Sequence, residues 1–112
     1  MNNQKIELRG FDWVCSWYQS QCDGDWEHEN QIKLITVSNP GWSLTIDLHG
    51  TSLEGVELEY CLLEVSDADW IGYKVQGNVF KASGDLTKLP RIFELFREIC
   101  ESEVAKIDLN QD

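Results

Sequence analysis

Hydrophobic residues recur at three- and four-residue spacing near the start of the chain and predict a helix over residues 7–22. The residues that share the apolar face of this helix are Phe11, Val14, Cys15, Tyr18 and Cys22. Polar residues occupy the opposite face. Trp13 and Trp17 lie one turn apart between the two faces, so they either widen the buried stripe or form an aromatic shelf at its edge.

The pattern then changes to alternation, which predicts an antiparallel sheet. Residues 32–37 are rich in β-branched side chains, and the turn residues Asn39, Pro40 and Gly41 follow them. The next strand is the clearest, because apolar side chains at 42, 44, 46 and 48 alternate with polar ones. A third strand falls within residues 56–65 with an ambiguous register, a fourth spans 70–75, and a short fifth ends near Ala82. Gly84 and Asp85 break the pattern again.

A second amphipathic helix is predicted from residue 87 or 88 to Val104, with Pro90 in its first turn, where a missing amide is tolerated. Its apolar stripe consists of Leu89, Ile92, Phe93, Phe96, Ile99 and Cys100. The predicted fold is therefore α+β: an N-terminal helix, an antiparallel meander of four to five strands and a C-terminal helix, with both helices packed on one sheet face. Residues 1–112 form one domain, with frayed tails expected at 1–6 and 107–112.

Composition adds a strong negative charge to this picture. Twenty acidic and nine basic residues give a formal net charge of -11, with a pI near 4.4. Nucleic acid is excluded as a partner, because such binding depends on Lys and Arg neutralising phosphates. A basic protein is the natural counterpart, although the charge also suits a role in solubility alone.

The cysteines and the chain ends bear on the cellular compartment. Cys15, Cys22, Cys61 and Cys100 include no C-x-x-C pair, and we interpret them as reduced core residues. The sequence shows neither a secretory leader nor an apolar run long enough to span a membrane. We expect a cytoplasmic monomer that does not bind membranes.

An acidic segment between the first helix and the first strand is the main candidate site. Its carboxylates and imidazole are Asp23, Asp25, Glu27, His28 and Glu29. A calcium loop needs Gly at its sixth position and Glu at its twelfth, and neither possible start supplies them. Zinc is excluded by similar reasoning, because His28 lacks a paired His or Cys at ligand spacing. We predict no metal site.

The same segment offers residues that a catalytic site could use. A hydrolase would use Asp25 or Glu27 with His28, or His49, as its base, and Cys22 is the only cysteine near this segment that could be the nucleophile. Neighbouring carboxylates raise the pKa of a thiol and disfavour the reactive thiolate. No phosphate-binding or hydrolase motif accompanies them. We expect no enzyme and no cofactor; the alternative is a small enzyme or a metal- or ligand-binding domain that uses residues 23–29.

Two further interpretations of the acidic segment remain. In the structural one, Asp23 or Asp25 caps backbone amides, Trp26 fills the core and His28 is a surface imidazole. In the other, carboxylates beside aromatic rings form a surface that captures Lys and Arg of a partner protein.

Several motifs together carry a family resemblance. They are the segment from Trp17-Tyr18 through Gln21-Cys22-Asp23-Gly24-Asp25-Trp26-Glu27-His28, then Asn39-Pro40-Gly41-Trp42, Asp47-Leu48, Gly50-Thr51 and Asp69-Trp70. In order and approximate spacing the chain resembles the immunity 53 family of bacterial polymorphic-toxin systems. It departs from the family pattern at Glu29-Asn30-Gln31 and at Val37-Ser38.

The resemblance implies a small cytoplasmic protein that binds and neutralises a cognate toxin domain, with no catalytic residue. We expect the carboxylates of Asp23, Asp25, Glu27 and Asp47 to face toxin Lys or Arg, with His28 beside them. Trp26, or Trp13 with Trp17, would supply apolar anchors. The charge suggests an acidic mimic that occludes the basic cleft of a nuclease-type toxin.

Overall fold

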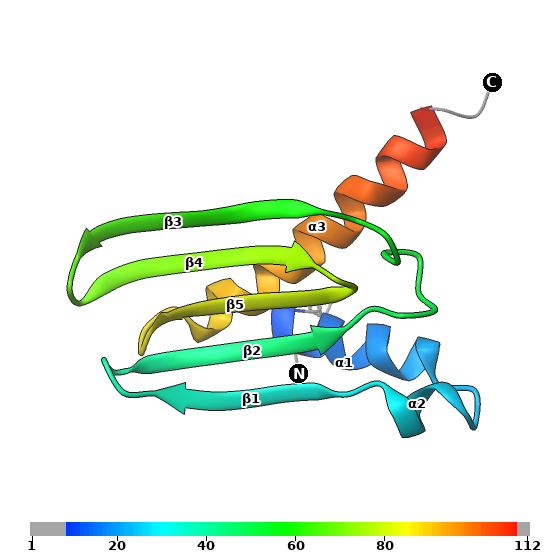
Figure 1. The fold of residues 1–112 in the computed structure, drawn as a ribbon, viewed down its shortest axis with the longest axis horizontal. Coiled ribbons are helices and arrows are strands. Elements are labelled where there is room, and N and C mark those ends of the chain that lie inside the picture. The colour runs from blue at the N-terminus through cyan, green and yellow to red at the C-terminus, as the bar shows by residue number, and fades with distance from the viewer. Residues whose placement is uncertain (1–8, 110–112) are drawn as a thin grey trace, which may run out of the picture.

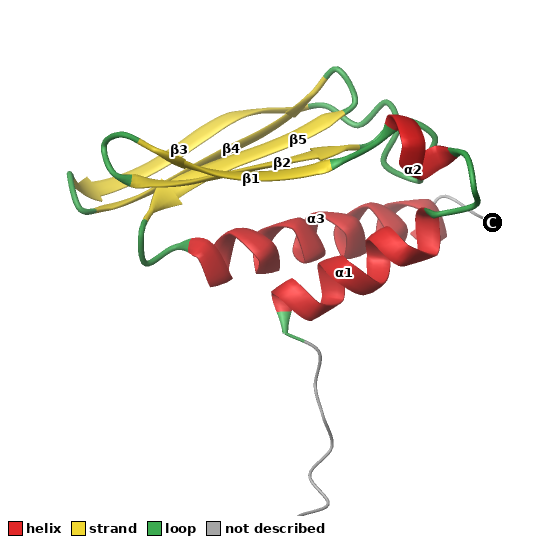
Figure 2. Ribbon diagram, turned by 90° about the horizontal axis from the view of Figure 1, so that it is seen from below, coloured by secondary structure: helices red, strands yellow, loops and turns green. Residues whose placement is uncertain are grey.

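The computed structural model describes residues 9–109, with side chains up to residue 106. A five-stranded antiparallel sheet forms one layer and two helices, α1 and α3, form the other, as Figure 2 shows. The sheet face turned away from these helices is uncovered and faces the viewer in Figure 1; we call it the open face. This arrangement confirms the predicted α+β class.

The elements follow the predicted order, with one short helix added after α1. In chain order they are α1 (Gly10–Gln21), α2 (Trp26–Glu29), β1 (Ile32–Val37), β2 (Gly41–Asp47), β3 (Leu58–Ser66), β4 (Asp69–Gln76), β5 (Val79–Asp85) and α3 (Leu89–Leu109). The strand order in the sheet is β1-β2-β5-β4-β3. A β1–β2 hairpin and a β3–β4–β5 meander are thus joined through β2 and β5, and β3 becomes the second edge strand.

The clearest predicted strand lies at the centre of the core. Leu44, Ile46 and Leu48 are 0% exposed, as the alternation predicts. Phe80 of β5 pairs with Ile46 and packs edge to face on Phe96 of α3, with ring centroids 5.1 Å apart. The predicted stripe of the last helix is confirmed, since all its members but the half-buried Leu89 are buried.

The predicted apolar face of the first helix is wrong by a rotation about its axis. Val14 and Trp17 are buried, whereas Phe11 is 57% exposed and the thiols of Cys15 and Cys22 are exposed. Trp17 stacks edge to face on Phe96 at 4.9 Å. An indole buries much more apolar area than a thiol, so the helix turns its tryptophans inward.

The prediction that the cysteines are core residues is also wrong for most of them. Cys100 is buried, Cys61 is half-buried and the other two thiols are exposed, so only one of the four is a core residue. All four are free, as expected. The sequence pattern failed because a small thiol contributes too little burial to orient a helix.

Element ends differ from the prediction at the C-terminal half. β5 continues through Gly84 to Asp85, and α3 extends beyond Val104 to Leu109. Residues 1–6, the predicted N-terminal tail, and 110–112 lie outside the described residues. Within residues 9–109, no helix combines the length and hydropathy that crossing a membrane requires.

Candidate functional site

The acidic segment between α1 and β1 is folded by its own carboxylates. Oδ1 of Asp23 accepts hydrogen bonds from the backbone N–H groups of Asp25, at 2.9 Å, and Trp26, at 2.8 Å. The two carboxylate oxygens of Glu27 accept from the N–H groups of Asp23, at 3.0 Å, and Gly24, at 2.9 Å. Gly24 has a φ of 97°, which glycine adopts readily. The segment is therefore a reciprocally capped turn leading into α2.

These bonds change the acidity of both groups. Backbone hydrogen bonds, first from Trp26 and then from Asp25, lower the pKa of the Asp23 carboxyl. For Glu27, the bond from its own backbone N–H is the largest cause lowering its pKa, with further contributions from Asp23 and Gly24. Both side chains thus remain ionised at neutral pH.

Trp26 joins the acidic segment to the domain. Its indole N–H donates to the carbonyl oxygen of His49 at 2.6 Å, and its ring meets Trp17 at 6.2 Å and Tyr18 at 5.1 Å. The Tyr18 hydroxyl donates to the carbonyl of Asn30 at 2.7 Å, closing the far side of α2. The structural interpretation of Asp23 and Trp26 is thereby confirmed, because both shape and fix the turn.

The remaining polar side chains of this segment point to solvent. Asp25, His28 and Glu29 are exposed, and within residues 9–106 their side chains accept or donate no hydrogen bond. Asp47 lies beside them, since its Oδ2 accepts from the N–H of Gln31 at 2.8 Å. We call the surface formed by residues 23–29 and Asp47 the acidic turn.

Trp13 and Trp17, two of the predicted aromatic anchors, do not belong to the acidic turn. Trp17 is 9% exposed and supports Trp26 from below. Trp13 belongs to the contact between α1 and α3, where it meets Phe96 at 6.3 Å and lies 6.0 Å from the guanidinium of Arg97. Of the predicted aromatic residues, only Trp26 is both part of the acidic turn and partly exposed.

The thiol closest to the acidic turn is a weak nucleophile. The Cys22 thiol donates to the carbonyl of Tyr18 at 3.3 Å. Partial burial, and then the charges of Glu27 and Asp23, raise its pKa, so the thiolate is disfavoured. Among the described residues, no group of three or more His, Cys, Asp or Glu side chains is placed to hold a metal ion.

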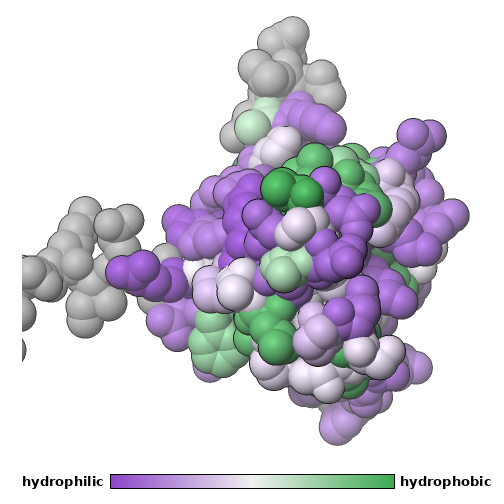
Figure 3. Space-filling model, turned by 90° about the vertical axis from the view of Figure 1, so that its left-hand side faces the viewer, coloured by the Kyte–Doolittle hydropathy of each residue, from purple (hydrophilic) through white to green (hydrophobic). Residues whose placement is uncertain are grey.

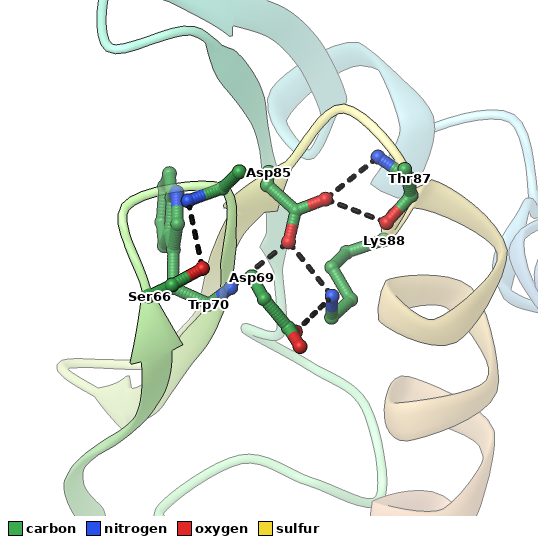
Figure 4. Close-up of polar contacts among 7 residues, drawn as sticks. Ser66, Asp69, Trp70, Asp85, Thr87 and Lys88 are labelled. Atoms are coloured by element: carbon green, nitrogen blue, oxygen red, sulfur yellow. Dashed lines mark hydrogen bonds and ion pairs between the residues drawn. The ribbon is translucent and has the colours of Figure 1, made fainter.

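Sequence reasoning missed a second polar cluster at the opposite end of the sheet, drawn in Figure 4. Asp85 is 4% exposed, and its Oδ2 accepts from the backbone N–H of Trp70 at 2.9 Å and from Lys88 Nζ at 2.7 Å. Its Oδ1 accepts from the N–H and hydroxyl of Thr87 at 2.8 and 2.6 Å. Lys88 also bonds Asp69 at 2.7 Å. The cluster ties β4 and β5 to the start of α3.

The same contacts determine the charge states of this cluster. The hydrogen bond from Lys88, followed by that from Thr87, holds the pKa of Asp85 far below its usual range. Bonds to Asp69 and Asp85 raise the pKa of Lys88. The sequence signal was weak, because Asp85 reads as a polar break after a strand until the pairing with β4 is known.

Comparison with known protein families identifies the chain. The model of the family described as immunity protein 53 matches residues 11–101, which cover nearly all of α1, all five strands and the first part of α3. Neither the curated proteins nor the solved structures that were compared give a match. The match covers most of the chain and agrees with the motifs around the acidic turn, so the protein belongs to the immunity protein 53 family.

Proposed function

We propose that the protein binds a cognate bacterial toxin domain and neutralises it by stoichiometric occlusion, without catalysis. Membership of an immunity protein family supports a toxin as the partner. The net charge of -11 favours a toxin with a basic surface, since opposite fields speed encounter and suppress wrong partners. An acidic mimic that covers the cleft of a nuclease-type toxin fits both features.

The acidic turn carries this proposal. The carboxylates of Asp23 and Glu27 accept hydrogen bonds from the backbone of the turn and so define its conformation. Asp25, His28 and Glu29 are exposed on this ordered turn. A preorganised surface loses less conformational entropy on binding than a flexible loop does. Each exposed carboxylate can therefore form a charge-assisted bond to a toxin Lys or Arg.

Aromatic and acidic neighbours complete the proposed contact. Trp26 presents a partly exposed ring beside these charges and Asp47 adds a carboxylate at the base, while the buried Trp17 supports Trp26. Trp13 would contribute only at the margin, from the α1–α3 contact. We propose that the protein acts as a cytoplasmic monomer and binds neither nucleic acid nor membranes.

The decisive experiment is a titration against the toxin. The partner would be the C-terminal domain of a large secreted protein encoded in the neighbouring upstream reading frame. Purified toxin domain loses activity in proportion to added protein, with an endpoint at one molecule per toxin molecule. Inhibition that continues to develop at far lower ratios would indicate turnover and contradict occlusion.

A matched pair of variants tests the acidic turn. Asp25→Asn with Glu29→Gln removes two exposed charges without touching the caps, and should weaken toxin binding about tenfold at low salt, mainly through slower association. Asp12→Asn with Glu94→Gln makes the same charge change on α1 and α3 and should have little effect. Equal losses in both variants would show that net charge, and not the acidic turn, drives binding.

A further inference from the structure

A cleft of about 450 Å³ opens at the end of the sheet opposite the acidic turn. Its lining residues come from the β1–β2 turn, from β3 and β4 and from the turn between those two strands: Asn39, Tyr60, Leu62, Glu64, Asp67 and Trp70. We call it the Trp70 cleft. Its volume lies within the range of sites that hold a side chain or a small ligand.

Strand pairing places this cleft on the open face. Ile71 and Tyr73 turn towards the core, so the residues between and beside them on β4 turn outward. Gly72 on that outward side pairs with Leu62 of β3 and with Ser83 of β5. The cleft therefore lies on the side that α1 and α3 leave uncovered.

Two glycines let aromatic rings lie close to the sheet. A Cβ atom on Gly72 would lie 2.7 Å from the Tyr60 hydroxyl oxygen, so that ring occupies the space of the missing side chain. A Cβ atom on Gly41 would collide with the carbonyl oxygen of Gly84 on the paired strand and would also lie 3.1 Å from the Trp70 ring. Both rings therefore lie close to the backbone of the sheet.

The apolar surface around the cleft is unusually exposed. Tyr60 is 62% exposed and Leu62 is 46% exposed. Figure 3 looks onto this end of the molecule and shows hydrophobic patches among hydrophilic ones. Exposed aromatic and aliphatic side chains with a polar rim are typical of a protein interface.

The rim of the cleft carries two acidic side chains that have no bonding partner among the described residues. Glu64 and Asp67 are exposed, and within residues 9–106 neither side chain forms a hydrogen bond or an ion pair. Asp69, by contrast, is bonded to Lys88. Neither lysine nor arginine lines the cleft. The site thus combines two aromatic rings with two unpaired carboxylates.

We propose that the Trp70 cleft receives an arginine side chain of the toxin domain. This inference rests on the proposed function and adds a second contact to it. A guanidinium can lie on the aromatic rings while its N–H groups reach the carboxylates of Glu64 and Asp67. A lysine would lose the planar stacking and the bidentate bonds, so arginine is the better fit.

A second copy of the chain is a poorer occupant, because both partners would bring a charge of -11. The distance between the two contacts is compatible with one toxin. Strands of seven to nine residues at about 3.3 Å per residue separate the ends of the sheet by roughly 25 Å. A standard interface of about 800 Å² per partner is roughly 30 Å across.

Between the two acidic regions, Lys33, Lys81 and Lys74 form a row across the open face, in register with Thr45. This row separates the two cation-binding regions. The toxin surface that faces the row must therefore lack basic residues, which makes the charge pattern specific as well as attractive.

The test measures toxin binding and dissociation with the full chain. Glu64→Gln with Asp67→Asn, and separately Tyr60→Ala, should each weaken binding about tenfold or more, with faster dissociation as the main change. The Asp12→Asn, Glu94→Gln pair is the charge-matched control and should bind like the wild type. Thermal unfolding of each variant checks that the fold is retained, which the exposure of all three cleft residues favours.

Three results would overturn the inference. If both cleft variants bind within about twofold of the wild type while the acidic-turn variant is impaired, the cleft is not a contact, although the proposed function stands. If the wild type self-associates and Tyr60→Ala makes it monomeric, a second copy is the occupant. If the wild type does not inhibit the toxin at all, the proposed function fails and this inference fails with it.

Discussion

The two ends of the sheet use carboxylates in opposite ways. At the acidic turn, Asp23 and Glu27 accept bonds from the backbone of their own segment and thereby build the surface that displays Asp25. At the far end, the structural work is done by the buried Asp85, while Glu64 and Asp67 stay unpaired beside the Trp70 cleft. At one end carboxylates hold the conformation of a charged turn, and at the other end unpaired carboxylates lie at the rim of an aromatic cleft.

This difference shows why acidic residues cannot be treated as one class. A carboxylate with a lowered pKa and several donors, such as Asp85, stabilises the fold and is unavailable to a partner. An exposed carboxylate without donors contributes little to stability and is available for binding. Substitutions should accordingly separate into those that unfold the protein and those that only weaken toxin binding.

The largest effect is expected where α1, α3 and the sheet meet. Phe96 contacts Trp13, Trp17 and Phe80, and its side chain is fully buried. Phe96→Ala should lower the free energy of unfolding by roughly 3–5 kcal/mol. Denaturant titration measures the change; a loss below about 1 kcal/mol would mean that the two layers are not held together here.

Asp85→Asn should produce the next largest loss, confined to the far end. The folded-state pKa of Asp85 lies well below its ordinary value near 4, so its contribution is present above about pH 4 and is lost as pH falls towards the folded-state pKa. The wild type should therefore lose stability on acidification more steeply than the variant. Thermal unfolding between about pH 6 and pH 2.5 tests this. Parallel curves for the two proteins would contradict the assigned role.

Asp23→Ala should have a moderate effect at the other end. It removes two bonds to backbone N–H groups and should lower Tm by roughly 2–8 °C. Because the turn would no longer be held in one conformation, the loss in toxin-binding free energy should exceed the loss in unfolding free energy. The exposed Asp25→Asn is the control, with unchanged Tm. An unchanged affinity for Asp23→Ala would separate the turn from the interface.

Trp70→Phe should have the smallest effect on stability. The indole N–H of Trp70 is buried and meets no acceptor among the described residues, so its removal eliminates an unsatisfied donor while an aromatic ring remains. The expected change in unfolding free energy is within about 1 kcal/mol and of either sign. A loss of several kcal/mol would show that the ring volume, not the unpaired donor, dominates there.

The local elements could be predicted from the sequence because each carries a strong periodic signal. The alternation around Leu44 and Ile46 set both the strand and its buried face, and Phe96 lies on the predicted stripe of the last helix. The family resemblance depended on the motifs of the acidic turn, which include the glycine with positive φ at position 24. Charge and composition further predict a partner other than nucleic acid.

Tertiary packing alone decided the rest. The rotation of α1 depends on how much area Trp17 buries against α3, a quantity that spacing along the helix does not contain. The roles of Asp85 and of the Trp70 cleft depend on long-range pairing of β5 with β2 and β4. Sequence periodicity reports which side chains share a face, whereas the neighbours across strands, and hence the sites, exist only once the sheet order is set.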